Sequence, residues 1–404
     1  MKWDKIKFSN LYSIESKNGL TKPSRVRGSG YKMINMGELF SYDRIYDIPM
    51  ELVPLTEREK CSSKVESGDL LFARQSLVLE GAGKCSIVMD VSPLTVFESH
   101  LIRVRLDSKR ANPLFYYYYF KSTQSPIKSI VSQCAQSGIR GSDLGELSVD
   151  FPVLEIQNRI ANILSNYDDL IENNQKQIKL LEEAAQRLYK EWFVDLRFPG
   201  YENTPITDGV PQGWNVRKLE TFGEIITGKT PSTAKESYYN GDIPFVKIPD
   251  MHNMIYPIIT ESTLSEEGAN TQKNKFIPKD SLMVSCIATV GLVNISIQNC
   301  QTNQQINSIV LNNVRDLYYL YFSTKGLKML LDGVGSNGAT MTNVNKSKFA
   351  NIEILYPSID LCEQFYDFCK PIFEKILVLS KSIIELKNSR DQLLPKLISG
   401  ELEV

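Results

Sequence analysis

The stretch Leu144-Gly-Glu-Leu-Ser-Val-Asp-Phe-Pro152 recurs 205 residues later as Phe349-Ala-Asn-Ile-Glu-Ile-Leu-Tyr-Pro357. In both copies apolar side chains alternate with polar ones before a proline, which predicts a strand that leads into a turn. The apolar positions coincide at one constant offset, as expected for two copies of one element. The pair therefore predicts an internal repeat.

Upstream of this stretch, further matched segments occur in the same order in both halves. They are Trp3 and Trp214, Thr21-Lys-Pro-Ser24 and Lys229-Thr-Pro-Ser232, residues 64–72 and 275–283, Gly83 and Gly291, and the aromatic runs 114–120 and 317–322. Because the order is kept and the offset drifts only slightly, a duplication explains the matches. Each half is expected to begin with a globular α+β domain of short strands and Gly/Pro/Ser turns.

Downstream of each proline, apolar residues recur at alternating spacings of three and four, which is typical of coiled-coil helices. Pro371 is tolerated only at a helix start or a kink, so the second helix is expected to begin there and to extend ~36 Å to Leu394. Two polar residues in the seam either fix the register or mark solvated ends, and the sequence favours neither. The two seams are Ile171, Asn174, Ile178, Leu181, Ala185, Leu188 and Trp192, and Ile376, Leu379, Ile383, Leu386, Arg390, Leu393 and Leu397.

The predicted organisation has four parts. They are a globular domain at 1–152, a helical region at 153–198, a second globular domain at 199–357 and a second helical region at 358–404.

The ionic balance of the 404 residues is 46 Lys+Arg against 47 Asp+Glu, a net charge of −1. Taken alone, this balance argues against a partner held by bulk charge. The charge is unevenly spread, however, since residues 1–150 carry 21 basic and 17 acidic side chains. The basic excess either lines a phosphate-contacting face or belongs to an ordinary solvated surface.

Cysteine and histidine usage bears on metal sites and on the compartment. The seven cysteines form no C-x-x-C pair, which favours buried thiols in a reducing cytosol. The two histidines are far apart, so no metal site is expected. No signal peptide or membrane span is recognisable, and we expect a soluble cytoplasmic protein.

Two segments imitate catalytic motifs. Residues 223–230, Gly-Glu-Ile-Ile-Thr-Gly-Lys-Thr, fit the P-loop pattern, but Pro231 follows directly and no helical periodicity does, so nucleotide binding is not expected. Asn112-Pro-Leu-Phe115 is similar to the Asn-Pro-Pro-aromatic motif of adenine methyltransferases, but it lacks the second proline and any accompanying methyl-donor loop. Catalysis is therefore not predicted, although loss of catalytic parts from a larger bifunctional enzyme remains an alternative.

The second globular domain is rich in amides, as in the tracts at residues 298–305 and 337–343. Amide side chains can bond adenine edges in the major groove, although ordinary loop composition also yields such tracts. The two aromatic runs could stack on bases, but at helical spacing we expect them in the core.

The chain resembles the specificity subunits of type I restriction–modification systems, nearly from end to end. The resemblance is carried by short segments in duplicate: Gly228-Lys-Thr-Pro-Ser232, Gly68-Asp-Leu-Leu71, the glycine loops 138–142 and 338–342, Phe151-Pro-Val-Leu-Glu-Ile-Gln157, Trp192-Phe-Val-Asp195 and Leu394-Pro-Lys-Leu-Ile-Ser-Gly-Glu401. The chain departs from the pattern at Cys362, which stands where the first helix has Gln157. That departure puts one local contact in doubt.

The resemblance implies two target recognition domains that are separated by two long antiparallel coiled-coil helices. Each domain would read one half of a bipartite, asymmetric double-stranded DNA site. Two methyltransferase subunits would dock on the helices, and two motor–nuclease subunits would join them. S-adenosylmethionine, ATP and Mg would bind to those partners, and this chain would hold no cofactor. The rival interpretation is a coiled-coil scaffold that binds no nucleic acid.

The residues that we expect to contact DNA come from the repeated turns and the glycine loops. They are Lys22, Ser24, Arg25, Arg27, Arg74, Arg140, Lys229, Thr230, Ser232, Thr340, Thr342 and Lys346.

Overall fold

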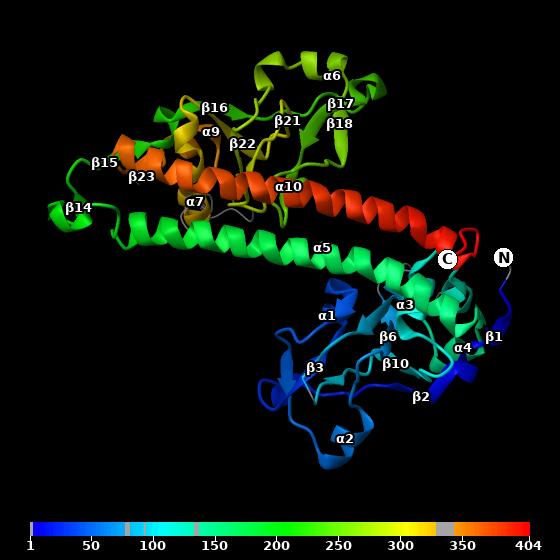
Figure 1. Cartoon of the computed structure of the whole chain (residues 1–404). Helices are drawn as coiled ribbons and strands as arrows, with labels where there is room; N and C mark the ends of the chain where they lie inside the picture. The colour runs from blue at the N-terminus through cyan, green and yellow to red at the C-terminus, as the bar shows by residue number, and fades with distance from the viewer. Residues whose placement is uncertain (1–2, 77–80, 93, 133–136, 329–342) are drawn as a thin grey trace. The chain divides into compact units, whose positions relative to one another are not determined.

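The computed structural model describes residues 3–76, 81–92, 94–132, 137–328 and 343–404, which form two units. Unit 1 comprises Met1–Ile171 and Glu385–Val404, and unit 2 comprises Glu172–Ile384. Each unit contains one globular domain and parts of both long helices, α5 and α10 (Figure 1). The four-part division of the chain stays a prediction, because the two units divide the chain within these helices.

Unit 1 is built on a five-stranded sheet whose central strands are fully buried. Its order is β2 (Tyr12–Asn18), β10 (Leu101–Leu106), β6 (Leu70–Ala73), β8 (Cys85–Val88) and β4 (Arg44–Ile45). A second sheet has the order β5 (Glu51–Val53), β3 (Tyr31–Ile34) and β9 (Val96–Phe97). Two strand pairs, β1 (Lys5–Lys7) with β12 (Ser148–Asp150) and β7 (Gln75–Ser76) with β11 (Ser137–Gly138), and the helices α1 (Met36–Ser41), α2 (Glu57–Ser62), α3 (Pro113–Lys121) and α4 (Gly141–Glu146) complete this domain.

Unit 2 repeats this plan with a four-stranded sheet. The order is β16 (Gly223–Thr227), β22 (Ile306–Leu311), β19 (Leu282–Ser285) and β20 (Val293–Ile295). The smaller sheet consists of β18 (Ser262–Leu264), β17 (Tyr239–Val246) and β21 (Gln301–Thr302). Two strand pairs, β15 (Asn215–Lys218) with β23 (Glu353–Tyr356) and β13 (Ile206–Thr207) with β14 (Val210–Pro211), and the helices α6 (Glu266–Asn270), α7 (Leu317–Gly326) and α9 (Lys346–Ala350) complete it.

The stretches that revealed the repeat form equivalent strands. β12 pairs antiparallel with β1, and β23 pairs antiparallel with β15, each just before the proline that precedes a long helix. Because the same pairings recur with the same neighbours, the predicted duplication and the α+β class are confirmed.

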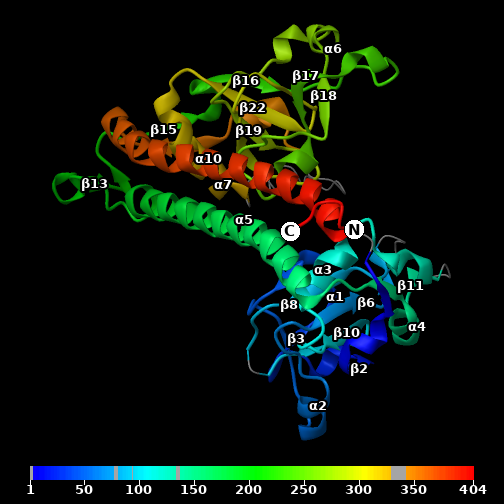
Figure 2. The same cartoon turned by 45° about the vertical axis from the view of Figure 1, so that its right-hand side comes forward.

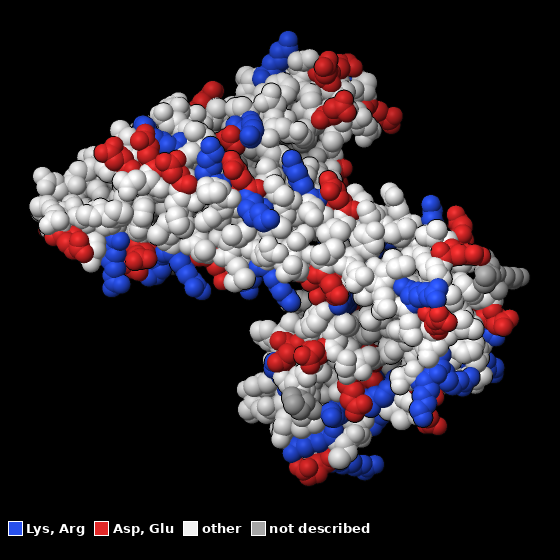
Figure 3. All heavy atoms as spheres, in the orientation of Figure 1, with Lys and Arg blue, Asp and Glu red and all other residues white. Residues whose placement is uncertain are grey.

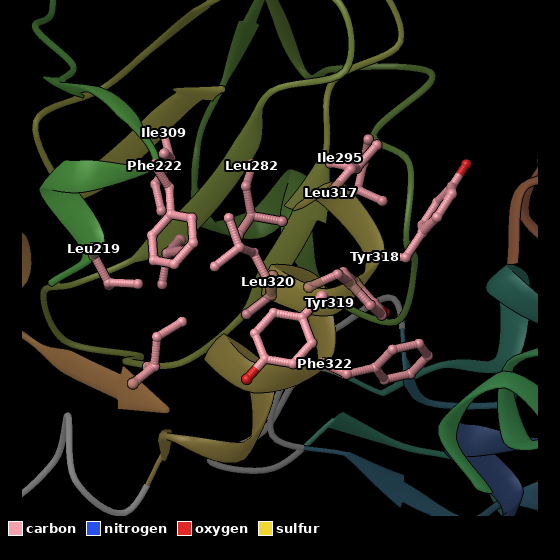
Figure 4. Packing of buried hydrophobic residues seen from close by; sticks show 14 of the residues in the cluster. Leu219, Phe222, Leu282, Ile295, Ile309, Leu317, Tyr318, Tyr319, Leu320 and Phe322 are labelled. Atoms are coloured by element: carbon pink, nitrogen blue, oxygen red, sulfur yellow. The ribbon is translucent and has the colours of Figure 1, made fainter. Parts of the chain in front are cut away.

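The aromatic runs lie in the two cores and not on a binding surface. In α3, all residues from Phe115 to Phe120 are buried. In α7, Tyr319, Leu320 and Phe322 pack with Leu282 and Ile309 of the sheet (Figure 4). The expectation that these rings are core residues is confirmed.

The segments that imitate catalytic motifs have structural roles. Gly223–Thr227 is the strand β16, paired along its length with β22, and the next α-helix in the described range 137–328 begins only at Glu266, whereas a P-loop leads directly into a helix. Asn112 caps α3, since its Oδ1 accepts hydrogen bonds from the backbone of Leu114 and Phe115 at 2.8 and 3.3 Å.

The long helices are α5 (Leu154–Tyr189), followed by a π-helical turn at Lys190–Val194, and α10 (Ile359–Ile398). The predicted start of the second helix at Pro371 is wrong, because α10 runs through this proline and contains 40 residues. Phe365, Cys369 and Phe373 are fully buried on either side of it. Their burial, at ~1.5–3 kcal/mol for a phenylalanine, outweighs a proline cost of ~3 kcal/mol.

The two helices run antiparallel within each unit (Figures 1 and 2). In unit 1, Arg159 of α5 donates to the backbone oxygen of Val404 beyond α10, and Asp168 pairs with Arg390. In unit 2, Asn174 contacts Ser382, and Trp192 packs against Phe365. In both units the residue numbers rise on one helix as they fall on its partner, so the antiparallel arrangement is confirmed.

Five cysteines are free and buried, as expected, and Cys61 is free and exposed. Burial raises the pKa of Cys286 to about 11 and that of Cys300 to about 12. Cys134 lies outside the described residues. No helix in the described ranges combines the length and hydropathy needed to span a bilayer.

Candidate nucleic-acid interface

The backbones of three basic residues lie close together where the central sheet of unit 1 ends. The backbone N–H of Arg74, just beyond β6, donates to the carbonyl of His100 at 2.8 Å, just before β10. The N–H of Ile139 donates to the carbonyl of Arg74 at 2.9 Å, and Arg140 follows as the first residue before α4. We call Arg74, His100 and Arg140 the first sheet-end site.

Unit 2 contains the same backbone frame. Cys286 donates to the carbonyl of Gln305 at 2.8 Å, and Val344 donates to the carbonyl of Cys286 at 2.9 Å. Asn345 follows as the N-cap of α9, in the place of Arg140. We call Cys286, Gln305 and Asn345 the second sheet-end site.

A glycine closes the frame in both units. Gly19 donates to Leu101 and Gly228 to Ile306, each at the end of the strand that borders its sheet. A Cβ at Gly19 would lie 2.0 Å from the carbonyl oxygen of Phe97, and one at Gly228 would lie 2.2 Å from that of Thr302. Only glycine therefore allows the chain to pass so close to its neighbour.

The side chains of the first sheet-end site are basic and accessible. The Arg140 side chain is exposed and has no hydrogen-bond or ion-pair partner among the described residues. The His100 side chain is 52% exposed, with Nδ1 3.4 Å from a Glu98 carboxylate oxygen. Arg74 is half-buried and donates from Nη1 to the carbonyl of Ser99 at 3.3 Å, a long bond that leaves its other N–H groups available.

The second sheet-end site is neutral, and its amides are partly engaged. The Gln305 Oε1 accepts a hydrogen bond from Asn303 Nδ2 at 2.9 Å, and the Asn345 Oδ1 accepts one from the backbone of Lys348 at 2.9 Å. Cys286 is buried. Two exposed lysines are adjacent in sequence to this frame: Lys346 follows Asn345, and Lys229 follows Gly228.

Two of the predicted DNA contacts in unit 1 are paired with carboxylates. Lys22 Nζ lies 2.8 Å from Glu59 Oε1, and Arg27 forms an ion pair with Glu51. If either residue contacts a phosphate, it first has to give up its ion pair, which costs free energy. Both contacts stay predictions. The neighbouring Ser24 and Arg25 are exposed, but they lie at the start of the smaller sheet and not at the sheet end.

The predicted contacts in unit 2 fall into three groups. Lys229, Ser232 and Lys346 are exposed, whereas Thr230 donates a hydrogen bond to Gln304 Oε1 at 2.8 Å. Thr340 and Thr342 lie outside the described residues, as does most of the 337–343 amide tract.

The amide tract at residues 298–305 is mainly structural. Gln301 is fully buried, and its Oε1 accepts a hydrogen bond from Gln272 Nε2 at 2.7 Å. Asn303 is also buried. Base contacts by these two amides are therefore ruled out. Of the next two amides, Gln304 and Gln305, Gln304 is exposed.

In Figure 3 the blue basic and red acidic side chains are interspersed over the visible surface of the globular part that carries residues 1–150. A net basic excess in this segment thus does not form one uniform face in this view. Within the described residues, no cluster of His, Cys, Asp and Glu has the composition of a metal site.

The family model described as "Type I restriction modification DNA specificity domain" matches the chain twice, over residues 2–183 and 211–388. The chain belongs to this family. The resemblance seen in the sequence is thereby confirmed, and each match begins beside one of the repeated tryptophans, Trp3 and Trp214.

Relatives in this specificity family match over most of their length. The chain is 30% identical over 403 residues to the specificity subunit of the type I restriction enzyme HindI of Haemophilus influenzae, covering 84% of this chain and 87% of that protein. It is 28% identical over 422 residues to the MjaIX specificity subunit of Methanocaldococcus jannaschii, covering 100% and 94%. The crystal structure of the S subunit of a type I system from M. genitalium has a TM-score of 0.62 at 16% identity, covers 98% of this chain and 96% of that chain, and shares the fold.

The helical seam of this specificity-family chain lies between α5 and α10. Ile171, Asn174, Ala185, Ile376, Leu379 and Leu397 are buried, and Ile178, Leu181, Leu188, Trp192, Ile383, Leu386, Arg390 and Leu393 are partly buried. Both polar residues of the seam have partners. Asn174 Nδ2 donates to Ser382 Oγ at 3.3 Å, and Arg390 binds Asp168 and Asp391.

Two matched tyrosines anchor the domains on α5, and neither was predicted as a functional residue from the sequence. Tyr118 of α3 donates to Asp168 Oδ2 at 2.6 Å in unit 1, and the equivalent Tyr321 of α7 donates to Glu182 Oε1 at 2.7 Å in unit 2. Burial and the neighbouring Asp168 carboxylate raise the pKa of Tyr118, which keeps its hydroxyl protonated as a donor. The aligned aromatic runs contained the signal, because both tyrosines occupy the same place in their runs.

Proposed function

We propose that this chain is the DNA-recognition subunit of a type I restriction–modification complex, and that each globular domain reads one half of a bipartite, asymmetric site. The observation that carries the proposal is the double match to the DNA specificity model on two domains with one backbone frame. The two frames carry different side chains at equivalent places. Two domains that share one backbone frame but present different side chains suit a site whose two halves differ in sequence.

The chain itself supplies recognition, and the reactions belong to partner subunits. Two methyltransferase subunits methylate adenines with S-adenosylmethionine, and two motor–nuclease subunits cleave DNA with ATP and Mg. The chain holds no cofactor and performs no catalytic step. Support comes from the curated relatives, which are named as specificity subunits of type I restriction enzymes.

Filter binding across a range of salt concentrations tests this proposal. The chain is purified together with its methyltransferase subunits and titrated with duplex DNA that contains the site, and with DNA that lacks it. We expect tight binding to the first duplex and a linear fall of log affinity with log salt, because phosphate contacts release counterions. Absence of any salt-dependent DNA affinity would contradict the proposal and leave a scaffold that binds no nucleic acid.

A further inference from the structure

We propose that the first sheet-end site reads guanine, with Arg140 as the principal base-contacting residue. This inference rests on the proposed function, because it names the base class that one domain of a DNA-recognition subunit selects.

The first step is the equivalence of the two frames. The bonds Arg74 N–H to His100 and Ile139 N–H to Arg74 are matched in unit 2 by the same two bonds at the same lengths. The backbone at this end of the sheet is thus held constant, while the side chains that it presents change completely. A surface with a fixed frame and variable side chains is suited to recognise different sequences with one architecture.

The second step is the chemistry of the side chains. Arginine offers only donors, in a planar fork that matches the O6 and N7 acceptors of guanine in the major groove. In the second site every frame residue is uncharged, and the amides Gln305 and Asn345 each have their oxygen engaged by a protein N–H. The two domains therefore differ in charge and in donor number at the same three positions.

The third step is accessibility. The Arg140 side chain is exposed and unpaired within the described part of the chain, and its neighbour Ile139 is hydrogen-bonded to the frame. Many other cations of this domain are paired, as Lys22 is with Glu59 and Arg105 is with Asp69. A base contact by Arg140 therefore requires no ion pair to be broken.

A lysine substitution separates base contact from phosphate contact. Arg140→Lys keeps the positive charge but replaces the planar fork by an ammonium group, so a phosphate contact survives it, whereas a guanine contact that depends on the fork is weakened. Arg140→Ala removes both. Arg58→Ala in α2 is the control, because Arg58 is also exposed and lies away from the frame.

The experiment uses the complete methyltransferase complex and a pool of duplexes that is randomised one position at a time within the recognised site. Methylated duplexes are sequenced for the wild type and for each variant. We expect Arg140→Lys to lose its preference for guanine by roughly tenfold at one position of one half-site and to leave the other half unchanged. Arg140→Ala should lose the same preference and bind more weakly overall, and Arg58→Ala should behave as the wild type.

Three results would overturn the inference: unchanged guanine preference in Arg140→Ala, a loss at an A·T position, or equal losses in both half-sites. Thermal unfolding of each variant shows that the fold is kept. If the wild-type complex itself selects no bipartite site, the proposed function fails. If the wild type selects one and Arg140→Ala does so identically, only the guanine assignment fails.

Discussion

Arg390 of α10 forms an ion pair with Asp168 of α5 inside the helical seam, and their side chains are only 18% and 8% exposed. The repeat aligns Asp168 with Phe373 and Arg390 with Ala185, which are both fully buried in the apolar core of unit 2. An ionic contact in one half thus occupies the place of an apolar contact in the other. Burial opposes the charge of Arg390, but its bonds to Asp168 and Asp391 raise its pKa.

Asp168→Ala is expected to destabilise the chain by about 3 kcal/mol, because it removes the buried carboxylate that pairs with Arg390 and leaves the Tyr118 hydroxyl without its acceptor, so that only the exposed Asp391 still pairs with Arg390. Urea unfolding of the purified chain measures this loss. The control is Asp391→Ala, whose carboxylate is 60% exposed and should contribute less than about 1 kcal/mol. Equal losses in the two variants would show that the seam pair has no special role.

Removing the hydroxyl from either anchoring tyrosine should cost about 1 kcal/mol each. Tyr118→Phe and Tyr321→Phe keep the packed ring and delete only the hydrogen bond to α5. Differential scanning calorimetry should show a lower melting temperature for both, with no change for Tyr201→Phe at an exposed site. A neutral effect of both substitutions would mean that the domains are held on α5 by packing alone.

Two carboxylates, the ion-paired Asp43 and the buried Asp316, should affect stability with opposite dependence on pH. Burial opposes ionisation of Asp43, but ion pairs with Lys121 and Lys84 outweigh it and hold its pKa below the ordinary value. Its contribution is therefore present above the unfolded pKa of about 4 and is lost as the pH falls through the folded pKa. Asp43→Asn should lower the melting temperature at pH 7 and have a smaller effect near pH 3.

Burial raises the pKa of Asp316, although Tyr356 donates a hydrogen bond to it. Its ionised form thus opposes folding once the pH exceeds the unfolded value. Asp316→Asn keeps an acceptor for Tyr356 and should raise the melting temperature at pH 7, with the gain vanishing as the pH falls below the unfolded pKa. The same sign for Asp43→Asn and Asp316→Asn at pH 7 would contradict this account.

The close approach at the two frame glycines predicts a steric effect. Gly228→Ala and Gly19→Ala place a Cβ within 2.2 Å of carbonyl oxygens and should each cost about 1–3 kcal/mol or more. Gly37→Ala in α1 has no atom within 4 Å of its new Cβ and should be neutral or slightly stabilising. Chemical denaturation of the three variants makes the comparison, and an equal response of all three would refute the crowded frame.

The repeat, the α+β class and the core position of the aromatic runs could be predicted because each depends on local periodicity. The start of α10 could not, since Pro371 is overridden by buried residues on both sides of it. The sequence did not show whether the amides of Gln301 and Asn303 are exposed for base contact or buried, because composition does not show which side chains turn inward. His100 and the partners of Lys22 and Arg27 depend on contacts between segments that are distant along the chain, and single-sequence patterns contain no record of those contacts.

Methylome sequencing of cells that contain this chain with its methyltransferase subunits tests the central claim most directly. It is run for the natural chain and for a chain whose residues 1–150 come from another recognition domain. We predict methylated adenines in a gapped, asymmetric motif, and a change in only one half of the motif after the exchange. A continuous motif, or replacement of both halves by the single exchange, would contradict two independent recognition domains.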